Sequence, residues 1–146
     1  PHTPLLSSAA SDVYKRQYHK DLKSLMSVAD VLSVCCPATK ETTNMINKKT
    51  LEYLPTGAVV TNVARGDIVD DEALIEALNS RKVYAVGLDV YQGEPNLNPG
   101  YLKHKSAFIL PHLGSASKQT RTAMGNLAID NIDEFFKTGS CKNKVN

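Results

Sequence analysis

Two hydrophobic patterns alternate along the chain from about residue 20 onward. Short continuous runs of apolar residues, typical of strands that are covered on both faces, occur at 31–36, 58–63, 85–90 and 107–110. Apolar residues spaced three or four positions apart, as on one face of a helix, occur within 21–29, 47–54, 70–78 and 117–138. This alternation predicts an α/β domain: a parallel sheet with helices on both of its faces.

Polar and small residues mark the ends of the predicted helices. Asp21 and Asp70 precede their helices as N-caps, Ser117 starts the long last helix, and Gly139 ends it. The connection 91–106 contains two prolines and two glycines and has little helical pattern, so we expect a functional loop there.

The first seventeen residues show neither pattern. They read PHTPLLSSAASDVYKRQ and join abruptly to the first amphipathic segment. We expect residues 1–17 to be an adapter-derived sequence attached to a gene fragment, with a native disordered tail as the alternative. Residues 18–146 are then the part that folds.

Composition and charge narrow the possible functions. The length of 146 residues suits one ordinary domain, and a net charge of +2 without a basic cluster argues against nucleic-acid binding. No apolar run approaches the roughly 20 residues of a membrane span, and no secretory signal pattern opens the chain. Three cysteines, with Cys35 and Cys36 adjacent, form neither a disulfide framework nor a metal-ligand spacing. We therefore expect a cytoplasmic protein without a metal site.

The glycines are unevenly distributed. All eight lie at or beyond Gly57, and no two are separated by a single residue. A glycine-rich loop that could hold a phosphate is therefore missing from this sequence, and any dinucleotide-binding interpretation must account for its absence.

Four chemically useful side chains follow successive predicted strands. Arg65 follows the second apolar run and His112 the fourth, whereas Asp89 and Glu94 lie at and after the end of the third. The carboxyl ends of parallel strands share one sheet edge, where ligands bind in such folds, so we expect the four to converge. Each also has a simpler interpretation. Arg65 could be a surface cation, Asp89 a turn cap and Glu94 a solvated acid. His112 could be a half-buried histidine with a hydrogen-bond partner.

Together these residue types suit the reduction of a 2-keto acid. Arginine binds a carboxylate through two hydrogen bonds, and a carboxylate beside histidine stabilises its protonated form, which can then deliver a proton near neutral pH. In this hypothesis Arg65 binds the substrate, His112 protonates the carbonyl oxygen and Glu94 orients His112. The hydride must come from a cofactor.

Three segments carry a family resemblance. VARGDIVD at 63–70, GLDVYQGEP at 87–95 and LPHLGS at 110–115 resemble the D-isomer-specific 2-hydroxyacid dehydrogenases, and the resemblance covers the chain from Tyr18 to its end. The stretch GEPNLNPGY at 93–101 is most similar to the glyoxylate/hydroxypyruvate reductase branch.

The resemblance implies a fold, a cofactor and a set of site residues. The fold would be the second half of a Rossmann-type parallel sheet with a long C-terminal helix, the cofactor NAD or NADP, the substrate a small 2-keto or 2-hydroxy acid, and the assembly a homodimer. Arg65, Glu94 and His112 would be catalytic. The expected cofactor contacts are Cys36, Pro37, Thr42, Val63, Ala64, Arg65, Asp89, His112, Gly114 and Ser115.

The missing features of the family lead to further expectations. Its G-x-G-x-x-G loop, its ribose-reading residue and the first part of its substrate domain would all precede this sequence. We therefore expect a C-terminal fragment that binds NAD(P) poorly, is inactive by itself, and leaves the strand at 31–36 as an unpaired edge. Two alternatives to the enzyme remain open: a non-catalytic, dinucleotide-sensing relative of the corepressors in this family, and an inactive truncated product.

Overall fold

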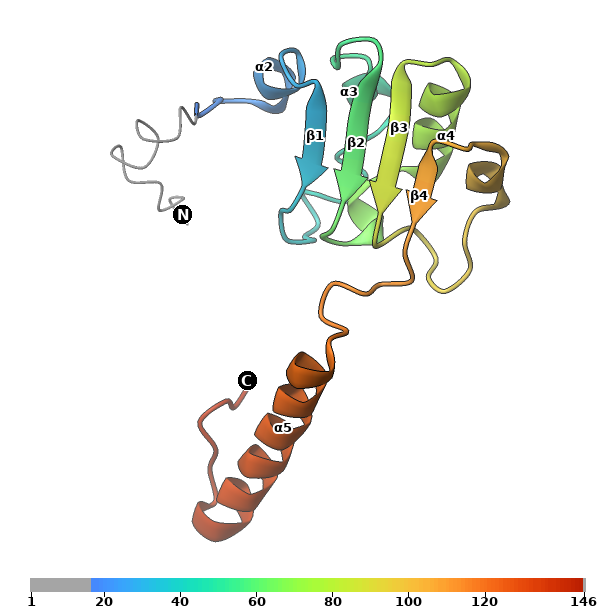
Figure 1. Cartoon of the computed structure of the whole chain (residues 1–146). Coiled ribbons are helices and arrows are strands. Elements are labelled where there is room, and N and C mark those ends of the chain that lie inside the picture. The colour runs from blue at the N-terminus through green and yellow to red at the C-terminus, as the bar shows by residue number, and fades with distance from the viewer. Residues whose placement is uncertain (1–16, 146) are drawn as a thin grey trace.

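A computed structural model describes residues 17–145 and shows a four-stranded, fully parallel sheet (Figure 1). Its strands lie side by side in chain order: β1 (Val31–Val34), β2 (Ala58–Asn62), β3 (Val83–Leu88) and β4 (Ala107–Ile109). Val34 of β1 pairs with Asn62 of β2, which in turn pairs with Leu88 of β3. The strands therefore end at one common edge, as the apolar runs predict.

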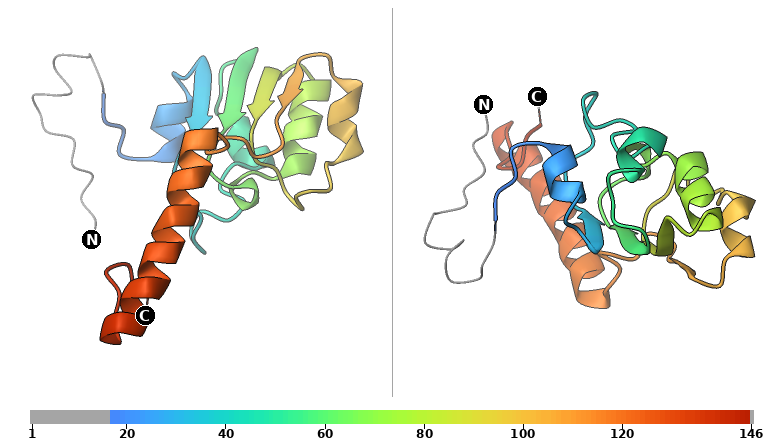
Figure 2. Two further views of the ribbon diagram at one scale, coloured as in Figure 1. Left: turned by 60° about the horizontal axis from the view of Figure 1, so that its bottom comes forward. Right: turned by 90° about the horizontal axis from the view of Figure 1, so that it is seen from above.

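Three short helices cover one face of this sheet: α2 (Leu22–Met26), α3 (Lys48–Leu51) and α4 (Asp71–Asn79) (Figure 2). Asp21 and Asp70 cap α2 and α4 as predicted, because each carboxylate accepts a backbone N–H at 2.8 and 3.1 Å. Within residues 17–145, no helix is both long enough and apolar enough to cross a membrane.

The core lies between the sheet and these helices. Alternate strand residues such as Leu32, Val60 and Val86 point into it and meet Met26, Leu51 and Leu74 from the helices. These six side chains are between 0 and 6% exposed. The period of two along each strand therefore determines which face of the sheet is buried.

The opposite face of the sheet differs from the prediction. The apolar runs predict helices on both faces, but the described helices leave this face open. Val31 of β1 and Phe108 of β4, which alternate with core residues, are 62% and 66% exposed. Continuous apolar runs predict strands that can be covered twice, but they do not tell whether the covering elements lie within the same stretch of sequence.

The last helix, α5 (Lys118–Thr138), is the longest element and projects away from the sheet (Figures 1 and 2). It starts and ends as predicted, with Ser117 accepting from the N–H of Thr120 and Gly139 in the left-handed conformation at φ 76°. None of its residues is buried. The apolar face of α5 therefore has no partner among the described residues.

Smaller differences concern the ends of elements. β3 begins at Val83, two residues before the apolar run, and the connection 91–106 contains a short 3₁₀ helix, η2 (Pro99–Lys103). A second 3₁₀ turn, η1 (Gly66–Ile68), follows β2. Within the described chain β1 pairs with β2 alone, so it is an edge strand as predicted. The prediction for residues 1–17 falls, apart from Gln17, outside the described residues and stays a prediction.

Candidate functional site

Asp89 connects the end of β3 to the segment that follows β4. Its two carboxylate oxygens accept the backbone N–H groups of Leu113 and Gly114 at 2.6 and 2.8 Å. Its own carbonyl oxygen accepts the N–H of His112 at 3.0 Å. Asp89 is 8% exposed, and both oxygens of its side chain are engaged by the protein itself. The structure therefore gives Asp89 an anchoring position beside His112.

His112 and Glu94 form the closest pair of titratable side chains at this edge. His112 Nδ1 lies 2.8 Å from Glu94 Oε2, and the other oxygen of Glu94 accepts the backbone N–H of Tyr91 at 3.1 Å. The carboxylate is an acceptor, so Nδ1 carries the proton in this pair. The His112 side chain is 48% exposed, which leaves Nε2 available to a bound molecule.

Arg65 lies at the same edge, in the turn that follows β2. The turn is held by Asn62, which is 1% exposed and whose side chain donates to the carbonyl of Arg65 at 2.8 Å and accepts the N–H of Ala64 at 3.0 Å. The Arg65 guanidinium is exposed, and its Nη1 donates to the carbonyl oxygen of Ala64 at 2.6 Å. Within residues 17–145 it makes no ion pair with a carboxylate, so its charge is free for an anionic ligand.

A close backbone contact joins the turn carrying Arg65 to the segment carrying Glu94. A Cβ atom at Gly66 would overlap the carbonyl group of Tyr91 and approach the nitrogen of Gln92 to 2.8 Å. Only glycine allows this approach. The turn after β2 and the loop after β3 are therefore in direct contact.

The predicted cofactor contacts form two groups. One surrounds a surface pocket at the ends of β1 and β2, lined by Cys35, Cys36, Pro37, Ala38, Val63, Ala64 and Arg65. The other is the hydrogen-bonded set of Asp89, His112 and Gly114. Thr42 closes the turn after β1 by donating to the carbonyl of Pro37 at 2.9 Å, so it stabilises the turn that carries Pro37. Ser115 is exposed next to the second group.

These groups fit only part of a dinucleotide. The pocket offers apolar side chains and backbone to a flat ring, with the exposed Arg65 in its wall, and His112 follows another strand at the same sheet edge. No glycine-rich turn exists in the sequence to receive a pyrophosphate. Among residues 17–145, no three His, Cys, Asp or Glu side chains gather closely enough to hold a metal ion.

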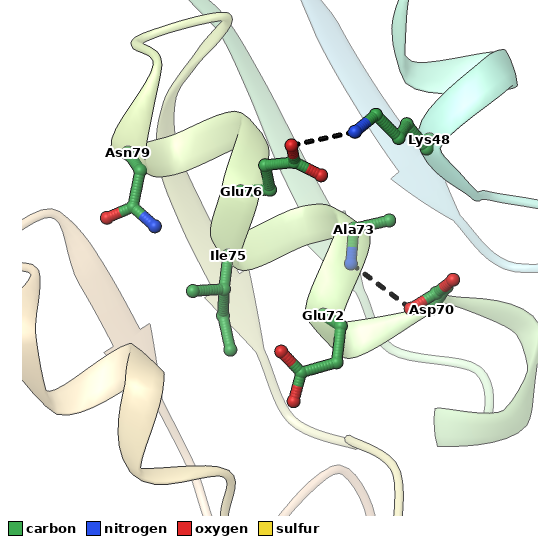
Figure 3. A pocket seen from close by; sticks show the side chains of 7 residues that line it. All are labelled: Lys48, Asp70, Glu72, Ala73, Ile75, Glu76 and Asn79. Carbon is green, nitrogen blue, oxygen red and sulfur yellow. Dashed lines mark hydrogen bonds and ion pairs between the residues drawn. The ribbon is translucent and has the colours of Figure 1, made fainter.

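A second surface pocket lies on α4, on the helical side of the sheet (Figure 3). Lys48 and Glu76 form an ion pair at 2.7 Å across it, and Asp70 caps the helix beside it. The pairing raises the pKa of Lys48, whose side chain is 71% exposed. This pocket shares no residue with the candidate site. Its Lys48–Glu76 pair joins α3 to α4, and its Glu72 accepts a hydrogen bond from Asn98.

The sequence pattern predicts the common edge of the four charged residues but not the residues that hold them. Asn62 ends an apolar run and Gly66 follows an arginine, and neither pattern by itself indicates a contact within the site. Their contacts join segments far apart in the chain, and the sequence does not report such contacts.

The family follows from a direct comparison. Residues 3–114 match the family model described as D-isomer specific 2-hydroxyacid dehydrogenase, NAD binding domain. The chain belongs to this family. The predicted fold, a Rossmann-type parallel sheet with flanking helices and a C-terminal helix, is thereby confirmed together with its NAD(P) cofactor class.

Relatives of the chain in this family include several reductases. The chain is 43% identical over 130 residues to glycerate dehydrogenase of Hyphomicrobium methylovorum, covering 89% of this chain and 40% of that protein. It is 37% identical over 126 residues to glyoxylate reductase of Thermococcus litoralis, covering 86% and 38%. The chain thus spans about two-fifths of the length of these relatives.

A solved structure of similar fold is the NADPH-dependent glyoxylate/hydroxypyruvate reductase of Sinorhizobium meliloti in complex with NADP and malonate. It superposes with a TM-score of 0.82 at 37% identity, covering 88% of this chain and 40% of that one. A 2-hydroxyacid dehydrogenase from Polaromonas superposes with a TM-score of 0.88 at 37% identity, covering 97% of this chain and 44% of that one.

Proposed function

We propose that this chain is the catalytic part of an NAD(P)H-dependent reductase of small 2-keto acids, of the glyoxylate and hydroxypyruvate type. The observation that carries the proposal is the 2.8 Å contact between His112 Nδ1 and Glu94 Oε2, at the same sheet edge as the unpaired Arg65. The likeness to glycerate dehydrogenase and glyoxylate reductase supports this substrate class.

In this proposal His112 handles the proton. Glu94 accepts the Nδ1 proton, which fixes the ring orientation and stabilises the positive charge when Nε2 is also protonated. Nε2 gives its proton to the carbonyl oxygen during reduction and takes it back during oxidation. NAD(P)H, when bound, supplies the hydride to the carbonyl carbon.

Arg65 binds the substrate in this proposal. Its planar guanidinium can bind the carboxylate of a 2-keto acid through two parallel hydrogen bonds. The buried side chain of Asn62 fixes the backbone on which Arg65 stands, so the guanidinium starts from a defined position. A carboxylate held by Arg65 would lie at the same sheet edge as His112.

The cofactor contacts in this proposal follow the two groups of the site. Cys36, Pro37 and Thr42 would contact NAD(P), together with the backbone of Val63 and Ala64. Asp89 would lie at the nicotinamide carboxamide, and Gly114 and Ser115 near the nicotinamide side. The homodimer expected from the family resemblance stays a prediction.

The test is made on the complete polypeptide that carries this chain, with glyoxylate and hydroxypyruvate as substrates and NAD(P)H absorbance as the readout. We expect His112→Ala to lower kcat by about 10²- to 10⁴-fold, because a positioned general acid contributes that much. Arg65→Ala should raise KM and lower kcat/KM. Arg121→Ala, which removes an exposed arginine of α5, serves as the matched control. Turnover within a few-fold of wild type for both His112→Ala and Arg65→Ala would refute the roles.

The 146-residue chain itself provides a second test. Without a glycine-rich loop there is no helix N-terminus to receive the pyrophosphate, so we expect no micromolar binding of NADH or NADPH by isothermal titration. Micromolar affinity would contradict this expectation and would mean that the contacts on the nicotinamide side suffice.

A further inference from the structure

The segment that carries Glu94 is held at both of its ends by one residue, Asp71. The backbone N–H of Asp71 donates to Gln92 Oε1 at 3.2 Å, and the hydroxyl of Tyr101 donates to Asp71 Oδ1 at 2.9 Å. Glu94 lies between Gln92 and Tyr101 in the chain. Asp71, in the first turn of α4, therefore links the first and last residues of the loop 92–101.

Asp71 and Tyr101 are both deeply buried, and a buried carboxylate is unusual. Asp71 is 4% exposed and Tyr101 is 1% exposed. Asp71 Oδ2 has no hydrogen-bond partner among the described residues, and burial raises the pKa of Asp71. A buried, half-satisfied carboxylate costs free energy. Helix capping does not require it, because Asp70 already accepts the N–H of Ala73.

The neighbours of Asp71 attach the same loop to the same helix turn. The side chain of Asn98 donates to Glu72 Oε1 at 2.8 Å. Gly100 lies so close to Ile75 that an added Cβ would come within 2.7 Å of Ile75 Cδ1. The 3₁₀ helix η2 is therefore seated on the N-terminal half of α4, with the Tyr101 hydroxyl pointing at Asp71.

We propose that Asp71 is a positioning residue that clamps the loop 92–101 and thereby keeps the Glu94 carboxylate against His112 Nδ1. The inference rests on the proposed function, in which the Glu94–His112 pair handles the proton. Asp71 does not touch the substrate in this scheme. It acts through Gln92 and Tyr101 on the loop, and through the loop on Glu94.

The Tyr101→Phe variant breaks the contact of the clamp at Tyr101 with the least disturbance, because it deletes the hydroxyl and keeps the ring in the core. Tyr84→Phe is the matched control, since Tyr84 is 68% exposed. The readout is amide hydrogen exchange by NMR on the 146-residue chain. We expect the Tyr91 amide, which is bonded to Glu94, to exchange at least about tenfold faster in Tyr101→Phe. The Val59 amide, bonded to Asp30 at the far end of the sheet, should keep its rate.

Conservative rescue separates a clamp from bulk packing. Asp71→Asn keeps a side-chain acceptor for the Tyr101 hydroxyl, and its own backbone N–H still donates to Gln92, so the Tyr91 amide should exchange nearly as in the wild type. Asp71→Ala removes the acceptor and should resemble Tyr101→Phe; if it fails to fold, Tyr101→Phe alone decides. Unchanged exchange of Tyr91 in Tyr101→Phe would overturn the clamp. A rise of equal size at Val59 would also overturn it, by showing general destabilisation.

Kinetics of the complete polypeptide provide the functional readout. We expect Tyr101→Phe to lower kcat by about tenfold with a smaller change in KM, since a misplaced Glu94 disturbs the reacting geometry more than binding. An unchanged kcat would overturn the positioning role even if the loop loosens. Full activity of His112→Ala would instead refute the proposed function, and the exchange data would still decide whether Asp71 clamps the loop.

Discussion

The carboxyl edge of the sheet and helix α5 are both well specified by local sequence, yet they differ completely in packing. At the edge, Asp89, Glu94 and Asn62 each contact a segment distant in the chain or fasten a turn. α5 is capped at both ends and is the longest element, but none of its residues is buried. Local signals such as caps and periodicity therefore determine where an element forms, whereas its packing depends on partners elsewhere.

The largest expected effect tests this contrast with one substitution in each region. Leu74→Ala in α4 should lower the free energy of unfolding by about 2–5 kcal/mol, because Leu74 is fully buried. Leu127→Ala in α5 should change it by less than about 0.5 kcal/mol, because Leu127 is 51% exposed. Urea denaturation followed by tyrosine fluorescence measures both. A comparable loss for Leu127→Ala would mean that α5 packs on the sheet in solution.

Two glycines sharpen the same comparison. Gly66→Ala should cost about 3 kcal/mol, since its Cβ would overlap the backbone of Tyr91. Gly125→Ala should instead stabilise α5 by about 1 kcal/mol, since nothing lies within 4 Å of the added Cβ and alanine favours helix. Circular dichroism should show more helix for Gly125→Ala with an unchanged tyrosine unfolding midpoint. A stable Gly66→Ala chain would disprove the close approach of the two loops.

The smallest expected effect is a pH dependence at Asp71. Burial raises the pKa of Asp71, so the folded chain binds its proton more tightly than the unfolded chain does. The contribution of Asp71 to stability therefore falls as pH rises from about 4, the ordinary value for aspartate, through the raised pKa. Asp71→Asn should gain stability relative to the wild type over that interval. Urea midpoints from pH 3.5 to 7 measure it, with the exposed Asp67→Asn as the control for charge; parallel curves would contradict the prediction.

Much of the site could be predicted because its residues follow the strands that position them. Arg65, Asp89 and His112 each come within a few residues of an apolar run, and parallel topology then brings them to one edge. Asp71 and Tyr101 could not be paired in this way, because a buried acid at a helix start has the same local pattern as a cap. The open face of the sheet was missed for a similar reason, since apolar runs do not identify what covers them.

His112 occupies the left-handed region at φ 56°, a conformation that histidine, asparagine, aspartate and glycine tolerate better than other residues. In the proposed function, two separate demands fall on His112: its side chain transfers a proton, and its backbone makes a left-handed turn. An alanine variant changes both, whereas an asparagine variant keeps the turn and removes the imidazole. Variants with every amino acid at position 112 would fall into three classes: active, folded but inactive, and poorly folded. The middle group would isolate the contribution of the ring from that of the bend.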